Sequence, residues 1–142
     1  MTTQLGRWIL LGSVLTGTLT ISPSALAQSY PDRTVTIVVT SAAGALTDVL
    51  TRAVGQRLSQ MWGQSIVVEN RGGAGHSLAA MAVKAAPADG YTLLASETGF
   101  VTSQPHLHSK GKLLYDPETE FVPVAGYAGI PEALLVNPAV PA

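Results

Sequence analysis

The chain has 142 residues, with eight lysines and arginines, nine aspartates and glutamates, and a formal net charge of −1 at pH 7. It has no basic run and so lacks the electrostatic footprint of a nucleic-acid-binding protein, and we expect no nucleic-acid partner. It contains no cysteine, which excludes disulfides, a thiol nucleophile and cysteine-ligated zinc.

Residues 1–27 have the three-part pattern of a secretory signal peptide. Arg7 supplies the positive charge, residues 8–21 form an uncharged apolar core, and the segment ends in Ala25-Leu26-Ala27, a small-x-small cleavage pattern. The core is shorter than the ~20 apolar residues that span a bilayer. We therefore expect export, cleavage after Ala27 and no stable membrane insertion afterwards.

Three runs predict strands in the mature chain: residues 34–39, 65–69 and 91–95. The first is β-branched and nearly continuous in apolar character, as expected of a strand buried on both faces of a parallel sheet. Each of the two intervals between them carries a helical pattern. The order strand, helix, strand, helix, strand is typical of an α/β fold with a doubly wound, mainly parallel sheet. About one small domain is expected from the length.

The first predicted helix has Thr47 or Asp48 as its cap and ends at Gly63, and the second covers residues 77–86. The apolar residues of each helix recur at three- and four-residue spacing and are expected to form one face. In the first helix they are Val49, Leu50, Ala53, Val54, Leu58 and Met61, and in the second Leu78, Met81, Ala82 and Ala85.

The remaining chain has weaker signals. Residues 116–121 predict a short capped turn, and the acidic side chains in it are expected to be solvated. Residues 122–128 and 133–137 are predicted as further strands because both are apolar.

Three loops are expected at the carboxyl ends of the strands, where parallel α/β sheets bind their ligands. They are residues 40–48, 70–77 and 96–103. In the first loop, small side chains and Gly44 precede a helix, whose free N–H groups suit a carboxylate. The alternative is a plain strand-to-helix connection.

The glycine cluster of the second loop invites comparison with a nucleotide site. Gly73 and Gly75 match the first two glycines of the dinucleotide fingerprint, but Leu78 stands where the third belongs. No cofactor is therefore expected. His76, His106 and His108 lack metal-ligand spacing and are interpreted as surface histidines, so no metal site is expected either. Ser96-Glu97-Thr98 has no readable third partner for catalysis, and we expect these residues to bind a ligand and the protein not to be an enzyme.

Several segments together resemble the Bug family, the periplasmic solute-binding receptors of tripartite tricarboxylate transporters. They are "YPDR" at 30–33, "GQSIVVENRGGAGHSLAA" at 63–80, "APADGYTLLA" at 86–95 and "LLYDPETEFVPVA" at 113–125. The resemblance implies a type II periplasmic binding protein whose partners are a small carboxylated solute, a carboxylate or an amino acid, and membrane transporter subunits. Residues 28–128 would form the first lobe, and residues 129–142 the start of a crossover to a second lobe.

The resemblance also implies the ligand contacts. The loops after the first and third strands would supply them, and the predicted ligand-binding residues are Ser41, Ala42, Ala43, Gly44, Ala45, Asp48, Ser96, Glu97, Thr98 and Gly99. One departure concerns the first loop, where the family usually has Pro-aromatic-x-Pro-Gly-Gly. Ala45 replaces the second glycine, and a side chain there enters positive φ less easily than glycine.

The second departure is length, because members of the family are more than twice as long. A site that closes between two lobes loses half its contacts without the second. The expectation is therefore an N-terminal fragment with little binding of its own. The alternatives are a nucleotide-binding enzyme domain and a non-binding remnant.

Overall fold

The computed structural model describes residues 29–108, 113–131, 133 and 135–138. The predicted signal peptide lies outside the described residues. None of the helices in the described part of the chain has the length and apolar character needed to cross a membrane.

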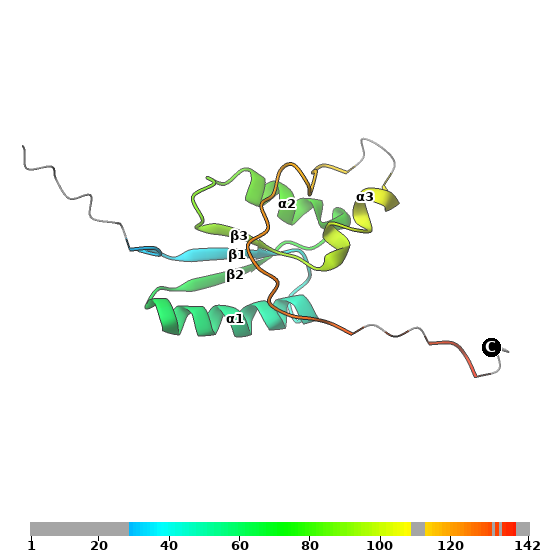
Figure 1. Ribbon diagram of the computed structural model, residues 1–142, viewed down its shortest axis with the longest axis horizontal. Coiled ribbons are helices and arrows are strands. Elements are labelled where there is room, and N and C mark those ends of the chain that lie inside the picture. Colours follow the sequence, from blue (N-terminus) through cyan, green and yellow to red (C-terminus); the bar gives the residue numbers. More distant parts are fainter. Residues whose placement is uncertain (1–28, 109–112, 132, 134, 139–142) are drawn as a thin grey trace, which may run out of the picture.

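The described strands form one parallel sheet in the order β2-β1-β3 (Figure 1). These strands are β1 (Val35–Val39), β2 (Ile66–Asn70) and β3 (Thr92–Ala95). Val39 lies opposite both Asn70 and Ala95. All three strands therefore end at the same edge of the sheet, and the three strand predictions are confirmed.

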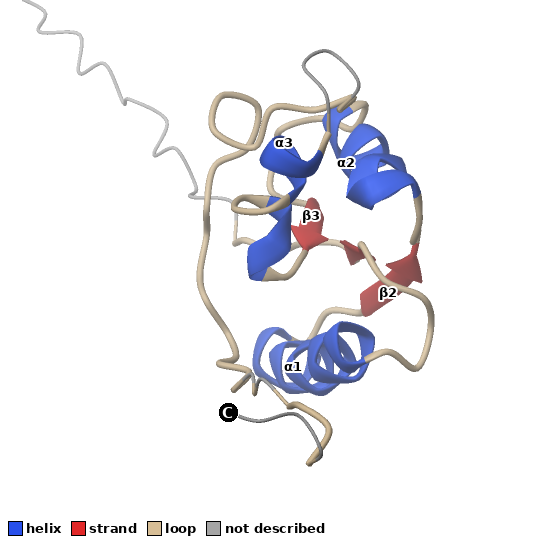
Figure 2. Cartoon of the chain, turned by 90° about the vertical axis from the view of Figure 1, so that its right-hand side faces the viewer, coloured by secondary structure: helices blue, strands red, loops and turns tan. Residues whose placement is uncertain are grey.

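Two helices cover opposite faces of this sheet (Figure 2). They are α1 (Leu46–Trp62), which follows β1, and α2 (Ser77–Lys84), which follows β2. A central first strand with helices on both faces is the doubly wound arrangement. The predicted fold class is confirmed.

Short helical segments complete the described structure. The 3-10 helix η1 (Ala74–His76) leads into α2, η2 (Thr98–Phe100) follows β3, and α3 (Gln104–Leu107) comes after it. Gly63, at φ 67°, ends α1 as predicted. The N-cap prediction is wrong, because Ala45 holds that position and Thr47 and Asp48 lie inside the first turn.

The apolar face predicted for each helix is only partly buried. In α1, Val49 and Met61 are 53% and 64% exposed, whereas Thr47, Thr51 and Gly55 are buried. A Cβ at position 55 would lie 3.1 Å from Ile66 Cγ2, so glycine lets the helix approach β2 closely. In α2, Leu78 and Met81 are exposed and the small residues Ser77, Ala79 and Ala80 are buried. Close packing on the sheet favours small side chains. Hydrophobic periodicity alone does not distinguish small side chains from large ones.

Two clusters of buried residues contribute to the core of the described part of the chain. One contains Ile37, Val39 and Ala95, with the flanking strand residues Ile66, Val68 and Leu93 packed against it. The other contains Ala80, Phe100 and Tyr115, with Leu94, Leu113 and Phe121. The second cluster links α2 to the loop after β3, and that loop is part of the candidate site.

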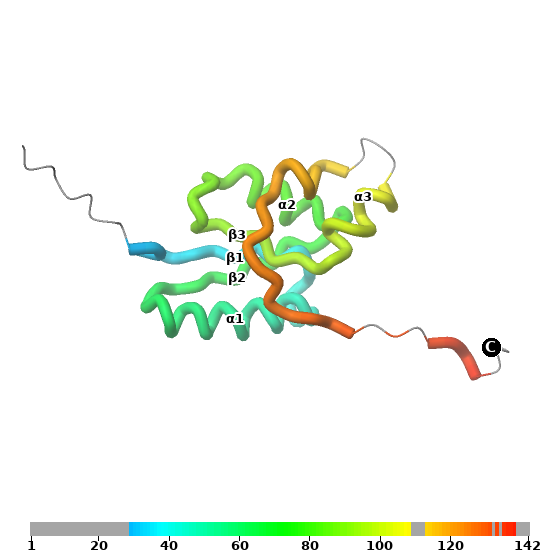
Figure 3. Tube along the Cα trace, viewed as in Figure 1, coloured from blue at the N-terminus to red at the C-terminus, as the bar shows by residue number. Residues whose placement is uncertain are grey.

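The segment after α3 differs from its prediction. The turn at 116–120 is confirmed, since Asp116 Oδ1 accepts from the Glu118 N–H at 2.9 Å and the Asp116 N–H donates to Glu120 Oε2 at 2.9 Å. Glu120 also pairs with Lys84, so it is not merely solvated. Residues 122–128 form no strand, and Val122 and Val124 are 88% and 83% exposed. Figure 3 shows this segment crossing the strands toward α1 rather than running alongside one of them, so it forms no strand ladder. The described residues of 133–137 likewise carry no strand.

Candidate functional site

Three loops meet where the strands end. Glu97, after β3, joins them: its Oε2 accepts a hydrogen bond from Thr47 Oγ1 at 3.2 Å, and its Oε1 lies 3.3 Å from His76 Nε2. Thr47 belongs to the start of α1 and His76 to the loop before α2. One carboxylate therefore contacts residues from both other loops, and its side chain is 46% exposed to solvent.

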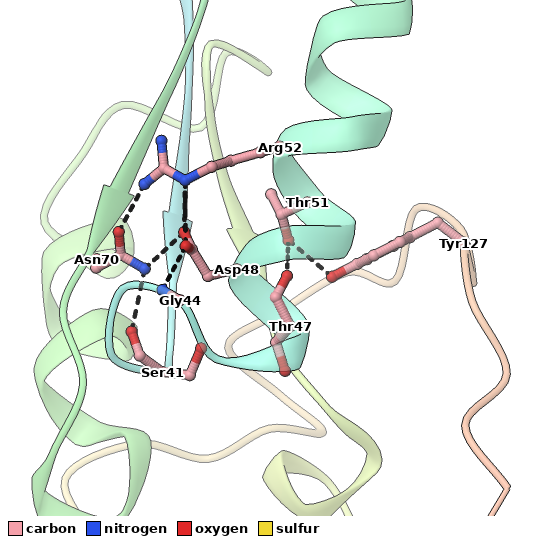
Figure 4. Close-up of polar contacts among 8 residues, drawn as sticks. All are labelled: Ser41, Gly44, Thr47, Asp48, Thr51, Arg52, Asn70 and Tyr127. Atoms are coloured by element: carbon pink, nitrogen blue, oxygen red, sulfur yellow. Dashed lines mark hydrogen bonds and ion pairs between the residues drawn. The ribbon is translucent and has the colours of Figure 1, made fainter.

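The first loop is held by a network around the buried Asp48 (Figure 4). Asp48 Oδ2 accepts from the Gly44 N–H at 2.8 Å, and Oδ1 accepts from Asn70 Nδ2 at 2.9 Å. Arg52 Nε donates to the same carboxylate at 3.1 Å, and Arg52 Nη2 donates to Asn70 Oδ1 at 2.9 Å. Asn70 Nδ2 also donates to the Ser41 carbonyl at 3.2 Å. These hydrogen bonds therefore tie the first loop to the last residue of β2 and to the start of α1.

These hydrogen bonds set the ionisation of Asp48. The bond from Arg52, followed by those from the Gly44 N–H and Asn70, lowers the pKa of Asp48 from 3.8 to about 2. Both oxygens are engaged by the protein, so the carboxylate positions the loop. A direct ligand contact for Asp48 stays a prediction.

The departure at Ala45 has no cost in backbone strain. Gly44 takes the positive φ of the loop, at 83°, whereas Ala45 lies at φ −68° and ψ 160°. That conformation is open to any residue. The loop therefore makes its turn with a single glycine.

An aromatic cluster anchors the third loop through its residue Phe100. Phe100 stacks on Tyr115 with centroids 4.4 Å apart and meets Phe121 edge-on at 5.3 Å. The Tyr115 hydroxyl is 3.3 Å from the carbonyl oxygens of Gly75 and Phe100, to which it donates. Burial raises the pKa of Tyr115. This cluster fixes the second and third loops relative to each other.

The second loop turns through left-handed backbone at Ala74, Gly75 and His76, with φ of 49°, 59° and 71°. The backbone here makes a tight strand-to-helix turn. We expect Gly75→Ala to cost about 1–2 kcal/mol, because a side chain at this φ is strained and its Cβ would lie 2.6 Å from His108 Cε1.

Chemical denaturation of the Gly75→Ala variant measures this loss. Gly126→Ala is the matched control, because a Cβ there meets no atom within 4 Å and φ is not positive. Equal stability of the two variants would contradict the strained turn.

Among the described residues, three buried polar atoms at the loops find no hydrogen-bond partner: Thr40 Oγ1, Ser41 Oγ and His76 Nδ1. The interpretation of His76 as a surface histidine is wrong, since its side chain is only 13% exposed. His106 is exposed as expected, and His108 is half-buried. Thr40 and His76 were missed as site residues, although a hydroxyl directly after an apolar strand was the available signal for Thr40.

The other predicted contacts lie in the first and third loops, as expected. Ala42, Ala43 and Gly44 are exposed, whereas Ser41 and Ala45 are half-buried. Ser96 Oγ donates to the carbonyl of Glu97 at 3.4 Å, and the Thr98 carbonyl accepts from Thr102 Oγ1 at 3.0 Å. A Cβ at Gly99 would lie 3.1 Å from Ser103 Oγ. The roles of these residues in binding stay predictions.

The described residues contain no group of three or more His, Asp or Glu side chains able to hold a metal ion. What they offer is hydrogen bonding from hydroxyls, imidazole and backbone at the N-terminal ends of two helices. That chemistry suits binding of a small polar molecule.

Comparison with known proteins identifies the family. Residues 50–142 match the family model described as tripartite tricarboxylate transporter family receptor, TctC. A UPF0065 protein of Bordetella bronchiseptica is 41% identical over 134 residues, which cover 94% of this chain and 38% of that protein. BugT of Bordetella pertussis is 31% identical over 132 residues, covering 93% and 40%.

A solved structure agrees with these matches. MatC from Rhodopseudomonas palustris, solved with bound malate, is 40% identical, with a TM-score of 0.63 over 69% of this chain and 33% of that one. The chain spans about two fifths of the length of the two relatives above. Members of this family are solute-binding proteins of transporters and not enzymes. The chain belongs to the TctC/Bug family of periplasmic receptors for tripartite tricarboxylate transporters.

Proposed function

We propose that the three loops bind a small carboxylated solute, a dicarboxylate or an amino acid, for delivery to a membrane transporter. The observation that carries the proposal is the meeting of the three loops at Glu97. The first and second of these loops also carry, among the described residues, the unpartnered polar atoms of Thr40, Ser41 and His76. Buried polar atoms without partners are rare in proteins, and a ligand is one way to satisfy them. The similarity to a malate-bound receptor supports the same class of solute.

The proposal has three further parts. Residues 1–27 direct export and are removed after Ala27. Residues 28–128 contribute to the first lobe of a two-lobed receptor, and residues 129–142 lead toward the second. The solute carboxylate is held by the first loop, residues 41–45, and by residues 96–99 of the third.

A thermal-shift screen tests the proposal. Ligands bound only by the folded state raise the melting temperature by mass action. We expect malate, succinate, adipate and glutamate at millimolar concentrations to include at least one that raises the melting temperature by about 2 °C or more. NAD and ATP serve as controls for the nucleotide alternative, and stabilisation by these alone would overturn the proposal.

A further inference from the structure

The segment at residues 122–131, called the strap below, is held to the rest of the fold at two points. At its start, the ring of Phe121 packs in the aromatic cluster. Farther along, the Tyr127 hydroxyl lies 3.0 Å from Thr51 Oγ1 of α1 (Figure 4). Among residues 122–131, Tyr127 alone has a hydrogen bond to another residue in the described part of the chain. One hydrogen bond therefore ties the strap to α1.

The direction of this hydrogen bond follows from the single proton of the Thr51 hydroxyl. Thr51 Oγ1 donates that proton to the carbonyl of Thr47 at 2.7 Å. Toward Tyr127 it can then only accept, so the Tyr127 hydroxyl is the donor. A hydroxyl that accepts a hydrogen bond becomes a better donor, and the two bonds strengthen each other.

Thr47 connects these bonds to the candidate site. Its carbonyl accepts from Thr51, and its own hydroxyl donates to Glu97 Oε2 at 3.2 Å. Thr47 and Thr51 are 6% and 2% exposed, so little water competes for the bonds between them. Tyr127 is thus connected, through two buried threonines, to the carboxylate at which the three loops meet.

The bond between Tyr127 and Thr51 can open at small cost. Tyr127 is 38% exposed, so water can replace Thr51 as the acceptor. Thr51 keeps its bond to the Thr47 carbonyl when Tyr127 leaves. The net loss is that of one neutral hydrogen bond, a factor of roughly five in an equilibrium constant. Val122 and Val124 of the strap are exposed and add no buried packing to oppose its release.

We propose that the hydrogen bond from Tyr127 to Thr51 is a latch that couples the strap to the solute site. This inference rests on the proposed function and deepens it, because it names a regulation of the same site. A solute bound at the loops orders Thr47 and Glu97 and so favours the latched strap. By linkage, the latched strap favours the bound solute by the same factor. Tyr127 and Thr51 are positioning residues, since they act on the site through Thr47.

Limited proteolysis of the chain with elastase measures the release of the strap. This protease accepts small aliphatic residues, such as Val124 and Ala125, and it cleaves the released state. We expect Tyr127→Phe and Thr51→Val each to raise the rate of cleavage in the strap about fivefold, relative to cleavage elsewhere in the chain. The double variant should be cleaved no faster than either single one, because both changes remove the same bond. Thr51→Ser, which keeps the hydroxyl, should behave as the wild type.

Thr102→Val is the matched control. Thr102 Oγ1 likewise donates to the carbonyl four residues earlier, that of Thr98, at 3.0 Å, but it has no bond to the strap. It should leave strap cleavage unchanged. Rates for Tyr127→Phe and Thr51→Val equal to that of Thr102→Val, or additive effects in the double variant, would overturn the latch whether or not a solute binds.

The coupling is tested by repeating the cleavage with malate, succinate, adipate and glutamate at the concentrations of the thermal-shift screen. A carboxylate that raises the melting temperature should slow strap cleavage of the wild type about twofold or more and have less effect on Tyr127→Phe. Stabilisation without slower strap cleavage would overturn the coupling and leave the proposed function standing. If none of the four carboxylates stabilises the chain, the proposed function and the coupling both fail, and the rates without ligand still decide the latch.

Discussion

Replacing Phe100 by alanine is expected to lower the free energy of unfolding by about 3–5 kcal/mol, the range for large aromatic residues in cores. Phe100 is 5% exposed and contacts Tyr115 and Phe121 through its ring. Its removal opens a cavity under the third loop and leaves Tyr115 without its stacking partner. The same change should weaken solute binding, because residues 96–99 lose their support.

Equilibrium unfolding in urea measures the first effect. Leu107→Ala is the matched control: Leu107 lies in the neighbouring helix α3 and is 74% exposed, so its loss should change stability by less than about 0.5 kcal/mol. Phe100→Leu, which keeps most of the volume, should cost about 1 kcal/mol. If Phe100→Ala were as stable as Leu107→Ala, the aromatic cluster would not support the site.

Replacing Asp48 by asparagine is expected to lower the melting temperature by roughly 10 °C. The carboxylate accepts hydrogen bonds from the Gly44 N–H, Asn70 and Arg52. In asparagine an NH2 group replaces one carboxylate oxygen. It cannot accept a hydrogen bond from the donor that it faces, so the first loop loses its anchor. Glu118→Gln, at an exposed carboxylate, is the control and should have little effect.

The pH dependence follows from the lowered pKa of Asp48. The folded state holds this pKa at about 2, against 3.8 for the ordinary carboxyl group. Because the pKa is lowered on folding, the contribution of Asp48 is fully present above pH 3.8 and is lost as pH falls toward 2. Thermal melts should show a constant difference between the wild-type and Asp48→Asn proteins from pH 5 to 7, and a smaller one near pH 3. A difference that grows on acidification would contradict the network.

The strands and their order along the chain were predictable because each is a short, largely apolar run, a pattern that needs no knowledge of pairing partners. The helix faces were not. Large and small apolar residues occur at compatible spacings in α1, and the choice between Val49 and Gly55 depends on how closely the helix approaches Ile66. The strand predicted at residues 122–128 was wrong for a related reason. A strand must pair with the edge of another strand, and local sequence does not reveal where that edge lies.

The loops of the site were predicted from the same strand pattern, whereas its buried polar atoms were not. The burial of His76 depends on surroundings that include Phe100, 6.3 Å away between ring centroids and distant in the chain. The role of Asp48 as an anchor likewise depends on Asn70, 22 positions away. Pattern reasoning identified the residue types, and long-range packing decided which of them hold the loops and which are left unpaired.

Mapping a solute onto the isotope-labelled protein by NMR tests the central claim most directly, because it also detects millimolar affinity. With malate added, the account predicts that the largest amide shifts occur in residues 40–45, 76–78 and 96–99, and that they saturate. Shifts confined to the opposite end of the sheet, around Tyr30 and Tyr91, or no shifts at tens of millimolar malate, succinate and glutamate, would contradict it.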